Sequence, residues 1–204
     1  MSTESNTAAT DAAIIAATRR WVDVAVISLN LCPFAKAVQH KGQVHYAVSH
    51  AQSEDALLKD LARELLALAD AERAVRDTTL LAVPDMLQDF LDFNDFLALA
   101  DELLERLGLA GELQVADFHP HYQFAGTEPD DVENCTNRAP YPTLHLLRES
   151  SIDQAVEAFP QASDIFERNI EVLRAMGMEG WRALDVGPAV QPSTSTNSPR
   201  EARE

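Results

Sequence analysis

The sequence predicts an α/β (α+β) protein: a mixed four-stranded sheet layered with helices. Four short segments are rich in β-branched residues and alternate as strands do, and longer segments with leucine at helical spacing separate them. After an N-terminal helix the core order is β-α-β-α-β-β-α, which is similar to that of the thioredoxin fold. The first two β-α-β connections favour parallel neighbours, whereas the last two strands, joined without a helix, are expected to be antiparallel.

The first half of the chain alternates regularly between the two patterns. Apolar residues at helical spacing predict a helix over residues 10–30, and residues 43–49 (QVHYAVS) alternate as a strand. Ser53 is expected to cap a helix over 53–72, whose buried stripe would consist of Leu57, Leu58, Leu61, Leu65 and Leu68. The mostly apolar run 78–83 (TTLLAV) is typical of a central strand.

The second half continues the pattern with one long interruption. A helix is expected over about residues 89–107, and Gly108 is its stop signal. Residues 113–119 (LQVADFH) and 143–148 (TLHLLR) alternate as the third and fourth strands. The 24 residues 119–142 join them, HPHYQFAGTEPDDVENCTNRAPYP. A loop of this length is usually functional or disordered, and its aromatic and proline content favours an ordered, functional loop.

The C-terminal part is predicted to be helical with two interruptions. Residues 151–154 (SIDQ) match a capping box that would open a helix. Pro160 interrupts this pattern, which resumes over 163–176 and is expected to end at Gly177. Trp181 is expected to pack against the core.

Length and composition favour one globular domain over residues 10–186 with disordered tails at 1–9 and 187–204. The net charge of −17 disfavours nucleic acids and anionic membranes as partners, and cationic or neutral small molecules fit better. No membrane span or signal peptide is recognisable. Two cysteines are too few for a disulfide framework, so free thiols and a cytoplasmic location are expected. Nothing in the sequence indicates a cofactor.

Cys32 is the best candidate for a nucleophile. Pro33 is suited to the first turn of a helix, which would place the Cys32 thiol near the helix N-terminus and lower its pKa. Redox chemistry of the C-x-x-C type is disfavoured because Ala35 stands where the second cysteine would be. The alternative is that Cys32 is a small buried hydrophobic residue.

The leading hypothesis is an enzyme that acts on a small anionic substrate at the 119–142 loop. Its catalytic residues would be Cys32 as nucleophile with a histidine base, drawn from His119, His121 and His145. Amide, phenol, ammonium and guanidinium groups would bind the substrate, namely Lys36, Tyr122, Asn134, Asn137 and Arg138.

Two alternatives remain open. One is a small-ligand-binding module without chemistry, built from the same loop. The other is a metal-binding protein that uses His119 and His121 with Cys32, Cys135 or His145, although no third ligand has a recognised spacing. Individual residues also have structural interpretations. His145 would be a hydrogen-bonded core histidine, and Arg138 would pair with a nearby carboxylate, among them Asp130, Asp131 and Glu133.

Several stretches of the chain resemble a known family. They are LNLCPFAKAV, TTLLAVPD, DFLDFNDFL, the run from HPHYQFAGTEPDD to NRAPYPTLHLLRE, and SIDQAV. Together they resemble the bacterial family catalogued as domain of unknown function 1415, over roughly residues 10 to 180. The resemblance implies a bacterial cytosolic protein of this size, with no established activity and no catalytic residues to carry over.

Overall fold

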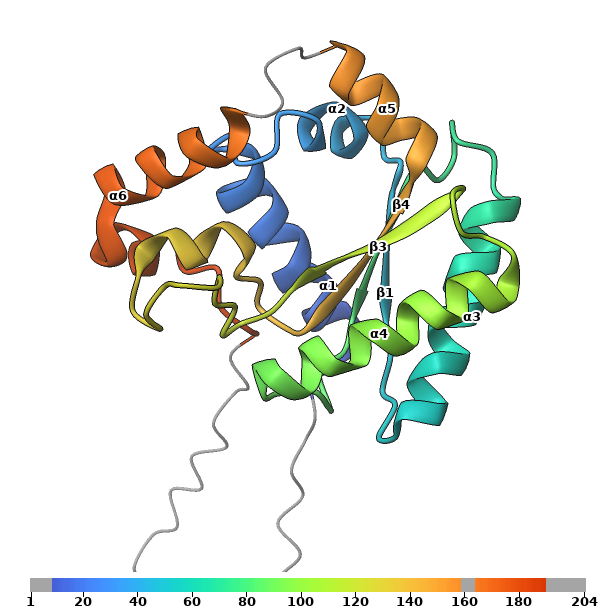
Figure 1. Cartoon of the computed structure of the whole chain (residues 1–204). Coiled ribbons are helices and arrows are strands. Elements are labelled where there is room, and N and C mark those ends of the chain that lie inside the picture. The colour runs from blue at the N-terminus through green and yellow to red at the C-terminus, as the bar shows by residue number, and fades with distance from the viewer. Residues whose placement is uncertain (1–8, 159–163, 190–204) are drawn as a thin grey trace, which may run out of the picture.

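A four-stranded sheet lies between two layers of helices (Figure 1). The computed structural model describes residues 9–158 and 164–189. The strands lie in the order β1-β2-β4-β3 across the sheet, and their bounds are β1 Val44–Val48, β2 Thr78–Ala82, β3 Leu113–Phe118 and β4 Thr143–Arg148. The predicted mixed sheet and the predicted order of elements are confirmed. The likeness to the thioredoxin fold remains a prediction that rests on this order along the chain.

The fourth strand occupies a position that the sequence did not predict. β1 and β2 are parallel neighbours, as expected, and β4 is antiparallel to both β2 and β3. The expectation that β3 would lie beside β2 is therefore wrong. β2 and β4 are the more buried strands and take the centre, whereas β3 is mostly half-buried, carries Gln114 and Asp117, and tolerates the edge. The carboxyl ends of β1, β2 and β3 share one edge of the sheet.

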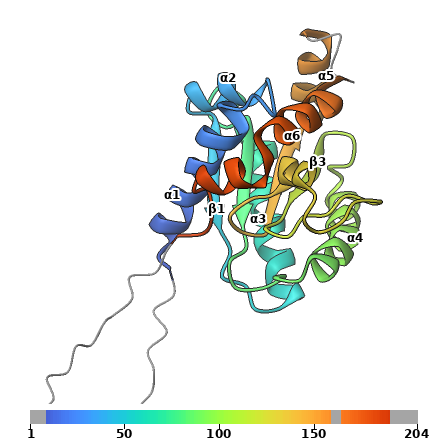
Figure 2. The same cartoon turned by 90° about the vertical axis from the view of Figure 1, so that its left-hand side faces the viewer.

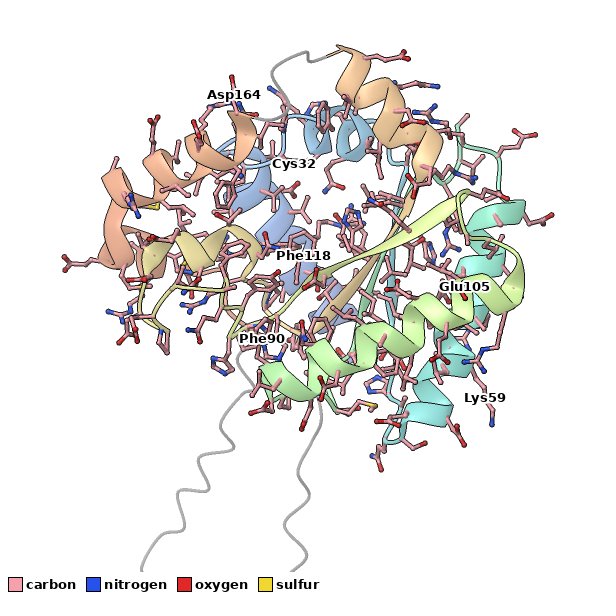
Figure 3. The ribbon with its side chains drawn as sticks, in the orientation of Figure 1. Cys32, Lys59, Phe90, Glu105, Phe118 and Asp164 are labelled. Carbon is pink, nitrogen blue, oxygen red and sulfur yellow. The ribbon has the colours of Figure 1, made fainter. Side chains whose placement is uncertain are left out.

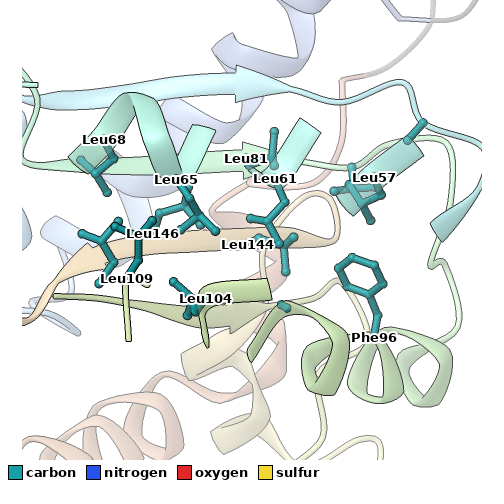
Figure 4. Packing of buried hydrophobic residues seen from close by; sticks show 14 of the residues in the cluster. Leu57, Leu61, Leu65, Leu68, Leu81, Phe96, Leu104, Leu109, Leu144 and Leu146 are labelled. Atoms are coloured by element: carbon teal, nitrogen blue, oxygen red, sulfur yellow. The ribbon is translucent and has the colours of Figure 1, made fainter. Parts of the chain in front are cut away.

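Helices α3 (Glu54–Asp70) and α4 (Phe90–Leu107) cover one face of the sheet. Their leucines and phenylalanines interlock with Leu81, Leu144 and Leu146 in the main core (Figure 4). The predicted Ser53 cap is confirmed, because its hydroxyl accepts from an amide of α3. Asp89, at the expected start of α4, caps that helix by accepting from two of its amides. Gly108 closes α4 with φ 71°, a left-handed conformation that favours glycine.

Helix α1 (Asp11–Trp21) covers the opposite face and continues into a π-helical turn, η1 (Val22–Ile27). Trp21 packs edge-on against Phe118, with ring centroids 5.0 Å apart. The predicted helix over residues 10–30 is thus helical to Ile27, but its second part has wider hydrogen bonds, such as Ser28 N–H to the Asp23 carbonyl. A short helix, α2 (Ala35–His40), leads into β1.

The C-terminal helices differ from the predicted ones. Helix α5 (Glu149–Ala158) follows β4 directly, so the predicted capping box at 151–154 is wrong. The Ser151 hydroxyl instead hydrogen-bonds Asp77 at 2.7 Å. Helix α6 (Ile165–Ala183) kinks at Gly177, where φ is 71° and ψ is 168°, and then continues beyond the predicted end. Trp181 packs against the core as expected.

Some predictions concern residues whose structure is not described. Pro160, Ser163 and the tails at 1–8 and 190–204 lie outside the described residues. Within the described part of the chain, every helix is too short or too polar to span a bilayer.

Candidate functional site

The 119–142 loop is held in shape by a buried amide. The Asn134 side chain is fully buried, and its oxygen accepts from the Phe124 amide at 3.0 Å and from the Thr127 hydroxyl at 2.8 Å. Its nitrogen donates to the Glu128 carbonyl at 2.8 Å. Because both ends of the amide serve the loop itself, these contacts give Asn134 a structural role.

The second part of the loop forms a 3₁₀ helix, η2 (Val132–Asn137), which packs against α6 (Figure 2). Cys135 is fully buried there against Leu31 and Leu173. On the outside, the Arg174 guanidinium of α6 pairs with Glu133 at 2.7 Å. The loop is therefore fixed to α6 by an apolar contact beneath and an ion pair at the surface.

His119 is locked as a neutral imidazole. Its Nδ1 accepts from the His121 amide at 3.0 Å, so its Nε2 carries the proton and donates to the Leu87 carbonyl at 3.0 Å. The residue is fully buried between the rings of Phe90 and Phe93, and burial lowers its pKa. Both nitrogens are occupied, so neither is open to a proton transfer or a metal ion. His119 ties the loop to the segment before α4.

Arg138 is partly buried and has an unusual set of partners. Its Nη2 donates to the Pro129 carbonyl at 2.6 Å, and its Nε donates to the Tyr122 carbonyl at 3.3 Å. Among the described residues no carboxylate lies within 4.0 Å of this guanidinium. The predicted alternative, an ion pair with a carboxylate of the loop, is therefore wrong. Glu133 pairs with Arg174, and Asp131 accepts from the Glu128 amide.

Two open hollows meet at Arg138. The α4-side hollow, of about 450 Å³, lies between the loop and the start of α4, and is lined by Gln88, Asp89, Phe90, Leu91, His121, Gln123, Pro129, Asp130 and Arg138. The α6-side hollow, of about 410 Å³, has Trp181 and Arg182 on its far wall and shares Asp130 and Arg138 with the first. Both volumes lie in the range of small-molecule sites.

The α4-side hollow lies where the topology favours a ligand. One wall follows the carboxyl end of β2, and the other follows the carboxyl end of β3. In open α/β sheets, ligands bind outside the carboxyl ends of the strands where the strand order changes direction. Here β4 is inserted between β2 and β3 and separates their carboxyl-end loops.

Cys32 lies elsewhere, in the turn between η1 and α2. Helix α2 begins at Ala35 with Phe34 as its cap, so Cys32 lies two residues before the cap and not at it. Burial raises the pKa of the thiol, and hydrogen bonds from the backbone of Phe34 and Ala35 only partly offset this, which is opposite to the expected direction. In Figure 3, Cys32 and Phe90 are drawn on opposite sides of Phe118.

His145 lies on the other face of the sheet from His119. It projects from β4 toward the α1 layer, where its ring meets that of Phe118 with centroids 5.8 Å apart. The Thr78 hydroxyl donates to the Leu146 carbonyl at 2.6 Å and so accepts from His145 Nε2 at 2.8 Å. Burial lowers the pKa of His145 to about 4. These contacts match the structural interpretation of this residue.

The depressed pKa of His145 predicts a loss of stability in acid. At pH values between the ordinary histidine pKa and about 4, His145 is protonated in the unfolded chain but stays neutral in the native one. The unfolded state is therefore favoured as the pH falls. Between about pH 7 and pH 4.5 we therefore expect the native chain to lose about 2 kcal/mol more stability than the His145→Leu variant, which lacks the titrating group. Urea unfolding of both proteins at the two pH values measures the difference. An equal loss in the two proteins would contradict the neutral state of the native ring.

The remaining predicted site residues are placed as follows. Lys36 is exposed on α2. The Tyr122 ring contacts Phe90 and Phe124 at 4.9 and 5.0 Å, and the Asn137 carbonyl accepts from the His119 amide. Of the predicted residues, His121 and Arg138 line these two hollows and the others line neither. Across the described residues, no three side chains of histidine, cysteine, aspartate or glutamate converge as metal ligands.

The sequence did not predict that the start of α4 and the end of α6 line the two hollows. Gln88 and Asp89 follow the carboxyl end of β2, and the strand-end rule could have identified them. Nothing local distinguishes Trp181 and Arg182, because only the tertiary fold brings α6 to the loop.

Comparison with known proteins gives one match. A family model described as "Protein of unknown function (DUF1415)" matches residues 13–183. No curated protein and no solved structure matches the chain.

Proposed function

The chain belongs to the DUF1415 family, and we propose from its own site that it binds a small molecule carrying an anionic group. The binding site is the α4-side hollow, with Arg138 as the anion-binding residue. His121 and Gln123 supply further polar groups on the loop wall. The single observation that carries the proposal is the guanidinium of Arg138, which faces two hollows without a carboxylate partner among the described residues.

The charge balance of the chain supports this role for Arg138. The chain has 33 acidic residues and 16 basic ones, so carboxylate partners are abundant. Arg138 is nevertheless oriented by two backbone carbonyls, which fix the guanidinium without neutralising it. A preorganised, uncompensated guanidinium favours a carboxylate or phosphate, because its planar donors match two oxygens at once.

Binding without covalent chemistry agrees better with the geometry than a Cys–His enzyme does. A histidine base must reach its nucleophile within hydrogen-bond distance. His119 uses one nitrogen within the loop and the other on the Leu87 carbonyl before α4, and His145 lies on the opposite face of the sheet. The raised pKa of Cys32 also keeps its thiol protonated at neutral pH.

Ligand binding should depend on Arg138. We expect a panel of small carboxylates and inorganic phosphate to contain a compound that raises the melting temperature by several degrees, since a ligand at ten times its Kd adds about 1.4 kcal/mol. Arg138→Ala should abolish the rise. Thermal melts with calorimetric titration of the active compound measure both effects.

Arg174→Ala is the matched control. It removes the same charge from α6, where Arg174 pairs with Glu133 of η2 outside both hollows. Cys32→Ser tests the enzyme hypothesis in the same assay and should leave binding unchanged. If no compound stabilises the native chain, or if Arg138→Ala binds as well as the native chain does, the proposal is wrong.

A further inference from the structure

We infer that the ligand is a zwitterion of the α-amino-acid class, with its carboxylate on Arg138, its ammonium on Asp130 and an apolar side chain against the start of α4. This inference rests on the proposed function, because it assigns the ligand of the same hollow. It adds a second, opposite charge and an apolar group to the anionic group proposed above.

The two charges are already placed in the site. Arg138 and Asp130 both line the α4-side hollow, and both line the α6-side hollow. Despite this proximity they do not form an ion pair, and within the described part of the chain Asp130 has no hydrogen-bond or ion-pair partner. A ligand that carries both charges satisfies the guanidinium and the carboxylate together. A simple anion satisfies the first and is repelled by the second.

The other carboxylate in the hollow already has a structural role. Asp89 caps α4, where its Oδ1 accepts from the amides of Leu91 at 2.8 Å and Asp92 at 3.3 Å. A cap carboxylate interacts favourably with the positive end of its helix, which reduces its attraction for a second cation. Asp130 is exposed and has no partner among the described residues. We therefore assign the ammonium to Asp130 and not to Asp89.

The apolar contact comes from the first turn of α4. Leu91 is 70% exposed and lines the hollow. Beside it the Phe90 ring is held against Tyr122, with centroids 4.9 Å apart. An apolar side chain laid against Leu91 and Phe90 would remove from water a surface that the fold leaves open. The hollow, at about 450 Å³, is large enough for a molecule of amino-acid size.

The charge of the whole chain also favours a zwitterion. At a net charge of −17 the protein repels free anions at long range, and a neutral zwitterion escapes this repulsion. The short-range attraction to Arg138 is retained in full, because it acts over contact distances where salt screens it least.

Matched probes separate this inference from the proposed function. We would titrate the full chain with L-leucine, with 4-methylpentanoate, which lacks the ammonium, with 3-methylbutylamine, which lacks the carboxylate, and with inorganic phosphate. L-leucine should bind at least about tenfold more tightly than each of the others, because only it meets both charges. Calorimetry gives the four dissociation constants.

Asp130→Asn tests the assigned ammonium site. It should weaken L-leucine at least about tenfold, since only L-leucine carries the ammonium. 4-Methylpentanoate should bind as tightly as before or more tightly, because the repulsion from the Asp130 carboxylate is removed. Asp95→Asn, an exposed change on α4 outside the hollow lining, is the matched control and should change neither constant.

The outcomes are distinct. Equal affinity for L-leucine and 4-methylpentanoate, or tighter binding of phosphate, would overturn the zwitterion and leave the anion site standing. An Asp130→Asn protein that binds L-leucine as the native chain does would also overturn it. If neither the carboxylate probes nor phosphate bind, the anion site is overturned as well.

Discussion

Replacing His119 with alanine is expected to destabilise the protein by about 3–4 kcal/mol, the cost of an aromatic-sized cavity with unpaired polar groups. The imidazole is fully buried between Phe90 and Phe93. Without it, the Leu87 carbonyl and the His121 amide lose their partners. The melting temperature should fall by about 10 °C for a domain of this size. Thermal and urea unfolding measure the effect.

His121→Ala is the control, because it removes the same side chain two residues further along the loop. His121 is exposed, and its loss should change stability by no more than about 0.5 kcal/mol. A His119→Ala protein that melts like the native chain would refute the structural role. His119 would then return as a candidate for chemistry.

The second large effect is expected at Arg148, at the end of β4. One guanidinium nitrogen donates to the carbonyl of Ala71 at 2.7 Å and also to those of Leu68 and Arg76. These carbonyls belong to the C-terminal end of α3 and the segment before β2, which have no other charged donor among the described contacts. Arg148→Met keeps the length of the side chain and removes the bonds, and should destabilise by about 3 kcal/mol.

Arg106→Met provides the comparison for Arg148→Met. Arg106 lies on the exposed side of α4 and pairs only with Glu102 one turn away, a kind of ion pair worth about 0.3–0.5 kcal/mol. Urea unfolding of both variants gives the two free energies. Similar small losses would mean that water replaces the Arg148 guanidinium at the end of α3.

The two variants bear differently on the site. His119 joins the 119–142 loop to Leu87, so its loss should loosen the wall formed by Gln88 and Asp89 and weaken ligand binding. Arg148 is tied to the end of α3, away from the residues that line the hollows. Arg148→Met should therefore weaken the fold and leave the affinity of the folded protein unchanged.

The sequence predicted most of the regular structure because local signals specify it. Ser53, Asp89 and Gly108 act on backbone groups within three or four residues of themselves, and such caps can be recognised without knowing the fold. The capping box at residues 151–154 failed because α5 already begins at Glu149, and the Ser151 hydroxyl donates instead to Asp77, 74 residues away. A local signature does not reveal such a competitor.

The candidate site was predicted in position but only partly in composition. The length and chemical content of residues 119–142 identified the loop, and Arg138 and His121 do line its hollow. The side chains of His119 and Asn134 are also capable of ligand binding or proton transfer, but their polar atoms are already paired in hydrogen bonds within the fold. The sequence shows which side chains have suitable chemistry. Only their hydrogen-bond partners in the folded protein show which of them are available to a ligand.

By itself the sequence determined the order of helices and strands, the Ser53 cap, the Gly108 stop and the loop in which chemical groups gather. These depend on backbone preferences and on periodic burial, which act over a few residues. Only the tertiary structure decided that β4 lies between β2 and β3, that the pKa of Cys32 is raised, and that Arg138 has no carboxylate partner within the described chain. Each of these depends on contacts between segments distant in sequence, whose desolvation and pairing exist only in the folded protein.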